Sequence, residues 1–262
     1  LLKRAAPATR IWVGDPTWTN HLGVLQAAGL EVLRHPYVPG ALPEEARRGD
    51  AILLQSCCHN PTGMDPTPAQ WETLAKDLTK KGILPVLDIA FLGYAEGIEA
   101  DLRPARILTK AVPELLICTS FSKSMELYGE RVGALTIVGS AETAFGHARS
   151  LARVNWSRPP AHGGAIVTEV LTDPELRTLW ETEVAGIRAR ILRMRHLLAQ
   201  GLGIHRIQEE KGIFTRLPVT PDQIGRLEKE EGIYLLPSGW INVVAMTEAQ
   251  LERLLGALRA GR

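Results

Sequence analysis

Cysteine is scarce in this chain of 262 residues, and its three copies do not suit a disulfide framework. Their number is odd, and two of them, Cys57 and Cys58, are adjacent. A reducing compartment, which we take to be the cytoplasm, is the simpler interpretation. No second Cys/His pair lies at the spacing of a zinc site, so no metal is expected. No apolar run approaches the roughly 20 residues that span a bilayer, and we expect no membrane partner.

An excess of one charge is also absent. The 30 basic and 29 acidic side chains nearly cancel, which gives no polycationic surface, so a nucleic-acid partner is not expected. What is present is ordinary: 45% hydrophobic and 23% charged residues, as in globular proteins. The length allows one large domain, or a large domain and a small one.

Short apolar segments alternate with helical patterns over the first two-thirds of the chain. Residues 51–56 are apolar without alternation, as expected of a strand buried on both faces, whereas residues 67–80 have helical spacing before Gly82. We expect strands at 10–13, 31–34, 51–56, 83–87, 115–119 and 132–138. This repetition of strand, helix and strand predicts an α/β fold, with a mostly parallel sheet flanked by helices.

One connection is too short for a parallel crossover. Only residues 121–131 separate the last two predicted strands, whereas a parallel crossover needs a dozen or more residues, usually with a helix. The segment 132–138 is therefore predicted to run antiparallel to 115–119. The result would be a mixed sheet with one reversed strand.

The last third has a different organisation. Asp173 is a helix N-cap before Pro174, and helical spacing then continues to about residue 201, which predicts a long helix that bridges two domains. We expect short strands at 212–216, 233–235 and 240–244, and helices at 221–231 and 248–259. The chain is therefore divided into a large domain, 1–185, and a smaller α/β domain, 186–262.

Polar residues gather where the predicted strands end. Asn60, Asp88, Ser120 and Lys123 follow three strands, and Arg131 precedes the reversed one, so all five should share one edge of the sheet. Taken singly, each could be a solvated charge, a turn cap or half of a salt bridge. Together they suit pyridoxal 5'-phosphate: a Schiff-base lysine, an aspartate for the ring nitrogen, an arginine and a serine for the phosphate, and an asparagine for the ring oxygen.

The motifs around these residues resemble those of the class I aspartate and aromatic aminotransferases. There are two longest matches. One is residues 57–67 (Cys-Cys-His-Asn-Pro-Thr-Gly-Met-Asp-Pro-Thr), and the other is residues 120–134, a segment that begins with Ser-Phe-Ser-Lys. The resemblance covers nearly the whole chain. It implies that Lys123 is the catalytic residue that holds the cofactor, that Asp88 faces the ring nitrogen and that Arg131 binds the phosphate.

The resemblance also implies roles for residues elsewhere in the chain. Trp18 would stack on the cofactor ring, and His21 would support the ring-nitrogen aspartate. Arg153 would bind the distal carboxylate of a substrate in the partner subunit of a homodimer. Phe214 and Trp240 belong to the small-domain motifs 212–214 and 237–243 and would contact the substrate.

Three departures from the family pattern concern binding. Trp240 stands where the family has an arginine that binds the substrate α-carboxylate through two hydrogen bonds, whereas tryptophan offers one N–H donor. Phe91 replaces a tyrosine that donates to the ring oxygen of the cofactor. The family's N-terminal segment, with its glycine-rich phosphate loop and dimer arm, has no counterpart here, so we expect weaker phosphate binding.

The leading hypothesis is an aminotransferase that acts on a dicarboxylic amino acid (aspartate or glutamate) or an aromatic one, with a keto acid as the second substrate. Two alternatives stay open because of Trp240 and the unmatched segment. One is a pyridoxal-phosphate enzyme with an altered reaction or substrate, and the other is a non-catalytic, aminotransferase-like remnant.

Overall fold

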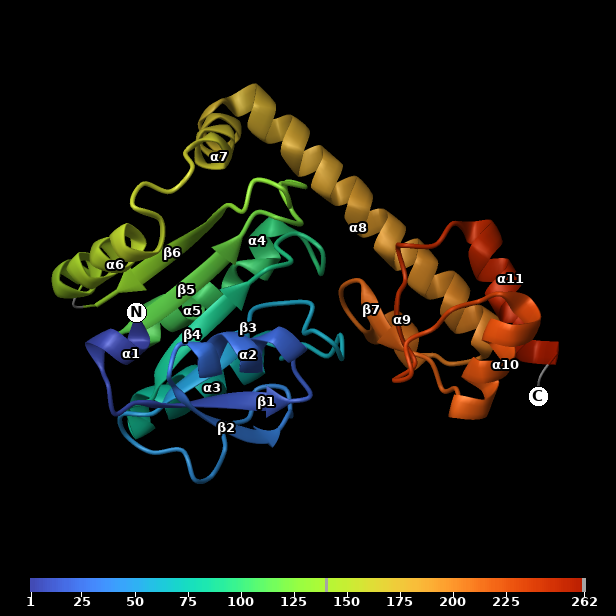
Figure 1. Ribbon diagram of the computed structural model, residues 1–262, viewed down its shortest axis with the longest axis horizontal. Helices are drawn as coiled ribbons and strands as arrows, with labels where there is room; N and C mark the ends of the chain where they lie inside the picture. Colours follow the sequence, from blue (N-terminus) through green and yellow to red (C-terminus); the bar gives the residue numbers. More distant parts are fainter. Residues whose placement is uncertain (140, 261–262) are drawn as a thin grey trace.

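The computed structural model describes residues 1–139 and 141–260, which form a large lobe and a small lobe joined by the long helix α8 (Pro174–Leu202) (Figure 1). The large lobe is built on a six-stranded sheet of order β2-β1-β3-β4-β5-β6. The strands are β1 (Arg10–Asp15), β2 (Glu31–Pro36), β3 (Ala51–Gln55), β4 (Leu84–Ile89), β5 (Leu115–Ser120) and β6 (Gly133–Val138). Every neighbouring pair is parallel except β5 and β6, which confirms the mixed sheet with one reversed strand.

Helices cover both faces of the central strands. On one face, Ile52 and Leu87 join a core with α3 (Pro68–Lys81) and α5 (Arg103–Ala111). On the other face, Ala51 and Val86 join a smaller cluster with residues of α1 (Leu2–Ala5) and α2 (Thr19–Ala27). Burial on both faces explains why β3 and β4 are continuous apolar runs in the sequence.

Three further helices complete the large lobe. They are α4 (Ile98–Asp101), α6 (Ala141–Trp156) and α7 (His162–Thr172). The helix α6 follows the reversed strand, and α7 leads into α8 (Figure 1). Among the described residues, no helix is both long enough and apolar enough to cross a bilayer.

The small lobe packs the end of α8 against α9 (Arg206–Glu209), α10 (Pro221–Glu231), α11 (Glu248–Ala260) and a two-stranded antiparallel sheet, β7 (Phe214–Arg216) and β8 (Trp240–Asn242). The expected strand at 233–235 is wrong. Ile233 N bonds to Leu227 O at the end of α10, and this segment pairs with no described strand. Ile233 and Leu235 are partly buried against the lobe core on either side of the exposed Tyr234, which accounts for the apolar residues at these two positions.

A buried arginine fixes the chain that leads into β7. Arg195 on α8 is 1% exposed and pairs with Glu210 at 3.1 Å. It also donates to the carbonyls of Ile207, Lys211, Gly212 and Phe214. Because burying an unpaired guanidinium would be costly, these acceptors hold the strand in one position relative to α8.

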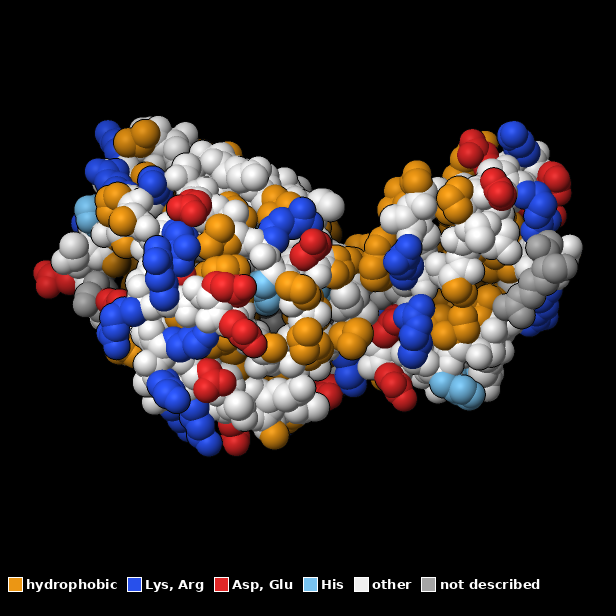
Figure 2. Space-filling view, turned by 90° about the horizontal axis from the view of Figure 1, so that it is seen from below, with side chains coloured by type: hydrophobic (Ala, Val, Ile, Leu, Met, Phe, Trp, Pro, Cys, Tyr) orange, Lys and Arg blue, Asp and Glu red, His pale blue; other side chains and the backbone are white. Residues whose placement is uncertain are grey.

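The helix α8 belongs to both lobes. Its first half buries Trp180 and Val184 against a cluster that contains Phe91, whereas its second half buries Met194 and Leu198 in the small-lobe core. The boundary that we predict between residues 185 and 186 falls inside this helix and stays a prediction. Figure 2 shows the two lobes on either side of a deep notch.

Candidate active site

The strand order brings the predicted polar residues to one edge of the sheet. Gln55, Asp88 and Cys118 lie side by side in register on β3, β4 and β5, so these parallel strands end together. Lys123 lies in the turn after β5, and Arg131 lies just before the antiparallel β6. The convergence expected from the sequence is thus present.

Lys123 is partly buried in an aromatic setting. Its Nζ lies 4.9 Å from the ring centroid of Phe91 and 5.6 Å from that of Tyr128. Burial lowers the pKa of Lys123; the Asp88 carboxylate opposes this effect and the Arg131 guanidinium adds to it. The Tyr94 hydroxyl donates to the Lys123 carbonyl at 2.9 Å and holds the backbone. A larger fraction of this amine is therefore neutral at a given pH than for a solvated lysine.

Asp88 is held by a chain of polar contacts from α2. His21 is 8% exposed, and its Nε2 lies 3.2 Å from Asp88 Oδ2, while its Nδ1 lies 2.9 Å from Thr17 Oγ1. Among the described residues, the second carboxylate oxygen of Asp88 has no hydrogen-bond partner. Trp18 meets the His21 ring edge-on at 5.1 Å and is 42% exposed, so it offers a free flat surface beside this carboxylate.

The loop that carries Asn60 is fixed from both sides. The Gln55 side chain exchanges two hydrogen bonds with the Asn60 backbone, at 2.9 and 3.3 Å. The Asp65 carboxylate accepts the backbone N–H groups of Cys58 and His59 at 2.7 and 2.8 Å. Within the described part of the chain the Asn60 side chain makes no hydrogen bond, so its amide is free for a ligand.

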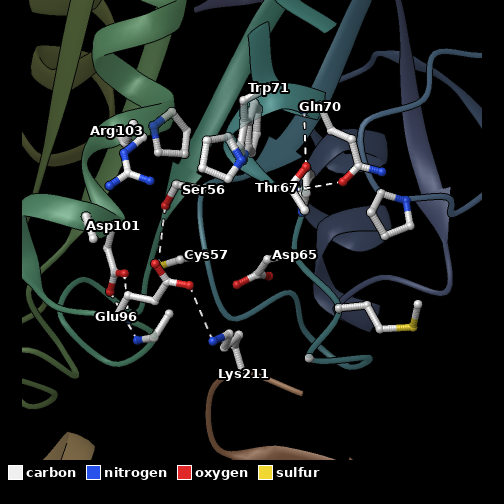
Figure 3. A pocket seen from close by; sticks show the side chains of 18 of the residues that line it. Ser56, Cys57, Asp65, Thr67, Gln70, Trp71, Glu96, Asp101, Arg103 and Lys211 are labelled. Carbon is white, nitrogen blue, oxygen red and sulfur yellow. Dashed lines mark hydrogen bonds and ion pairs between the residues drawn. The ribbon is translucent and has the colours of Figure 1, made fainter. Parts of the chain in front are cut away.

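Asp65 also faces a large cavity between the lobes. The cavity, of about 630 Å³, is lined by large-lobe residues and by 206 and 209–211 of the small lobe, but it does not include Lys123. In Figure 3 the Asp65 side chain points into this space, above the ion pair of Lys211 and Glu96, which are 3.4 Å apart. Burial raises the pKa of Asp65 to about 6, against its two backbone hydrogen bonds.

Ser120 is the last residue of β5, before the Lys123 turn, and Arg131 lies just before β6. Ser120 Oγ accepts the backbone N–H of Ser122 at 3.3 Å. Arg131 has a left-handed backbone (φ 51°), is exposed, and donates to the Tyr128 carbonyl through one terminal nitrogen at 2.9 Å. A hydroxyl and a guanidinium near the same strand ends can hold an anion.

The remaining predicted residues differ in their positions. Phe214 of the small lobe meets Phe91 edge-on at 6.4 Å and so reaches the Lys123 edge. Trp240 is partly buried on β8, beside the strand that carries Phe214. Arg153 is exposed on α6, and in residues 1–139 and 141–260 its side chain makes no hydrogen bond or ion pair, so its role in a partner's site stays a prediction.

Three residues that support the site had no assigned role in the sequence. Tyr94 and Trp180 fix the Lys123 turn, since Trp180 Nε1 donates to the Ser124 carbonyl at 2.6 Å. Asp65 holds the Asn60 loop. The first two act across 29 and 56 residues of chain, so no local pattern indicates them, whereas Asp65 falls within the matched motif 57–67.

The chemistry of this edge fits pyridoxal phosphate. The partly desolvated amine of Lys123 suits covalent attachment to an aldehyde, and the free oxygen of Asp88 suits a ring N–H. The exposed Trp18 ring suits stacking, and the Arg131 guanidinium suits a phosphate.

Comparison with known proteins agrees with this chemistry. The family model for aminotransferase class I and II matches residues 1–258. An aspartate aminotransferase of Salmonella typhi is 41% identical over 99% of this chain and 71% of its own length. An aromatic-amino-acid aminotransferase of Pseudomonas aeruginosa is 37% identical over 96% and 68%. The solved aromatic-amino-acid aminotransferase of Burkholderia pseudomallei, covalently bound to pyridoxal phosphate, has a TM-score of 0.92 at 36% identity over 99% and 70%.

Proposed function

The chain belongs to the aminotransferase class I and II family, and we propose that it is a pyridoxal-phosphate-dependent aminotransferase for dicarboxylic or aromatic amino acids, with a keto acid as the second substrate. The names of the similar proteins support both substrate classes, since they include aspartate and aromatic-amino-acid aminotransferases. The observation that carries the proposal is Lys123, a partly buried amine with a lowered pKa at the edge that also holds Asp88 and Arg131.

The residues divide the work between holding the cofactor and moving a proton. Lys123 would hold the cofactor covalently, and Asp88 would accept a hydrogen bond from its ring nitrogen. Arg131 and Ser120 would bind its phosphate, and Asn60 would donate to its ring oxygen. When bound, pyridoxal phosphate supplies an electron-withdrawing ring that stabilises negative charge at the substrate Cα.

Proton transfer falls to Lys123 once its amine is free. Burial favours the neutral amine over the charged one, and its Nζ would take the proton from the substrate Cα. His21 holds Asp88 in place through the 3.2 Å contact, so the negative charge stays beside the ring nitrogen. The exposed ring of Trp18 would stack on the cofactor ring.

We also propose a cytoplasmic homodimer, with a division into domains 1–185 and 186–262. Three free cysteines support a reducing compartment. The exposed Arg153, whose side chain bonds to no described residue of its own chain, supports a role in the site of a second copy. Mixing inactive Lys123→Ala and Arg153→Ala proteins should restore part of the activity, because a mixed dimer would contain one intact site; no recovery would argue against shared sites.

The test of the reaction is a half-reaction with the full-length protein. Cofactor-loaded protein is mixed with aspartate, glutamate, phenylalanine or tyrosine, and both the cofactor absorbance and the keto acid are measured. We expect stoichiometric keto acid and the pyridoxamine form of the cofactor, and no conversion in Lys123→Ala. An unchanged cofactor with every donor would contradict the proposal. A product other than the keto acid would favour an altered reaction, which Trp240 makes the second candidate.

A further inference from the structure

The two-stranded sheet of the small lobe has two distinct faces. In the register of β7 and β8, Phe214 pairs with Asn242 and Arg216 pairs with Trp240. Thr215 and Ile241 between them are 0% and 8% exposed and point into the small lobe. Because side chains alternate along a strand, Phe214, Arg216, Trp240 and Asn242 share the opposite face.

That face is the one turned toward the Lys123 edge. Phe214 meets Phe91 edge-on at 6.4 Å, and Phe91 in turn lies 4.9 Å below Lys123 Nζ. Trp240 and Arg216 are thus the next pair along a face whose first aromatic ring already contacts the site. If a substrate is held at Lys123, the part of it that points toward the small lobe would contact this face of the sheet.

Trp240 carries no charge, so a carboxylate on that side needs another cation. Arg216 is its direct cross-strand neighbour, at the roughly 5 Å Cβ separation of such pairs. The other arginines near β7 are engaged, since Arg195 and Arg206 both bind Glu210. Arg216 instead is exposed and forms no ion pair within the described residues.

The position of Arg216 leaves the two terminal nitrogens of its guanidinium available to a ligand. Its Nε donates to the Ser238 carbonyl at 3.0 Å, which orients the guanidinium. In the part of the chain that the structure describes, its two terminal nitrogens have no partner. Two parallel N–H groups of one guanidinium match the two oxygens of a carboxylate.

We propose that Arg216 binds the α-carboxylate of the amino-acid substrate and that the Trp240 ring forms the apolar wall beside it. The assignment rests on the proposed function, and it makes Arg216 the residue that selects substrates with a carboxylate at Cα. Trp240 then favours an apolar group next to that carboxylate and disfavours a second ion pair at the same place.

The test measures binding of 3-indolepropionate, a non-reacting acid with a single carboxylate, to the cofactor-loaded full chain by calorimetry. Arg216→Gln should raise the dissociation constant about 10- to 100-fold, and Arg216→Lys less, because the charge remains without the fork. The uncharged analogue 3-indolepropanol should bind parent and Arg216→Gln alike. Arg177→Gln, which removes an exposed arginine paired with Glu181 on α8, is the matched control and should change nothing.

Failure of the inference is distinguishable from failure of the proposed function. Each variant is reduced with borohydride, and the label on Lys123 is measured. Suppose that the parent is labelled at Lys123. If the parent and Arg216→Gln then bind 3-indolepropionate with the same affinity, or if the parent does not bind this acid, the assignment of Arg216 alone is overturned. A parent without label at Lys123 overturns the proposed function, and the assignment of Arg216 with it.

Discussion

Asp65 offers a stability prediction with a defined pH window. Its carboxylate accepts two backbone N–H groups at 2.7 and 2.8 Å in the loop that carries Asn60. Burial nevertheless raises its pKa from 3.8 to about 6, with Asp101 adding to the rise and Lys211 opposing it. Ionising Asp65 therefore costs more free energy in the folded chain than in the unfolded one. Asp65→Asn removes this ionisable group.

The sign and size follow from the two pKa values. Between about pH 4 and about pH 6 the folded chain retains the proton that the unfolded chain has lost, so the free energy of unfolding falls as pH rises. The full shift of about 2 pKa units corresponds to ~3 kcal/mol. Of this, about 2 kcal/mol should be lost between about pH 4.5 and about pH 7.

The assay is urea unfolding of the parent and Asp65→Asn, followed by circular dichroism at both pH values. The other titrating groups are shared, so the difference between the two proteins isolates Asp65. We expect the parent to lose about 2 kcal/mol relative to Asp65→Asn on going to neutral pH. The same pH dependence in both proteins would refute the reasoning, whatever their absolute stabilities.

Three other substitutions test separate parts of the structure. Asp88→Asn removes the carboxylate that we propose for the cofactor ring nitrogen, so we expect the half-reaction rate to fall at least about 100-fold with the fold intact by circular dichroism. Gly212→Ala should lower the melting temperature by an amount equivalent to about 1–3 kcal/mol, because its Cβ would lie 2.5 Å from that of Cys58 at a φ of +74°. Arg195→Met should destabilise the chain by about 3–5 kcal/mol in urea, because it removes the buried partner of Glu210 and the donor to four backbone carbonyls, and a loss below 1 kcal/mol would show that these buried contacts matter little.

Much of the fold was predictable because the large lobe follows strong local rules. Continuous apolar runs mark β3 and β4, and the short segment between β5 and β6 requires the antiparallel pair that the structure contains. The small lobe was less predictable. Residues 233–235 form a short apolar run that suits a strand, but they pack on the lobe core without a described partner strand, and such a run does not show whether a pairing partner exists.

The candidate site was predictable where topology alone places residues. Asp88, Ser120 and Lys123 follow from strand ends, and His21 from the resemblance; its contact with Asp88 is present. Contacts between distant segments were not predictable. Tyr94 reaches the Lys123 turn from the segment after β4, and the bond of Trp180 depends on how α8 packs on the large lobe; no spacing in the sequence specifies either contact.

The most direct test of the central claim is covalent trapping at Lys123. The full-length protein is incubated with pyridoxal phosphate, reduced with borohydride and digested, and the modified peptide is identified by mass spectrometry. We predict one phosphopyridoxyl group on Lys123, absent in Lys123→Ala, with the neighbouring lysines unlabelled. Scattered labelling, or none, would contradict a competent cofactor site and would leave a non-catalytic, aminotransferase-like protein as the better account.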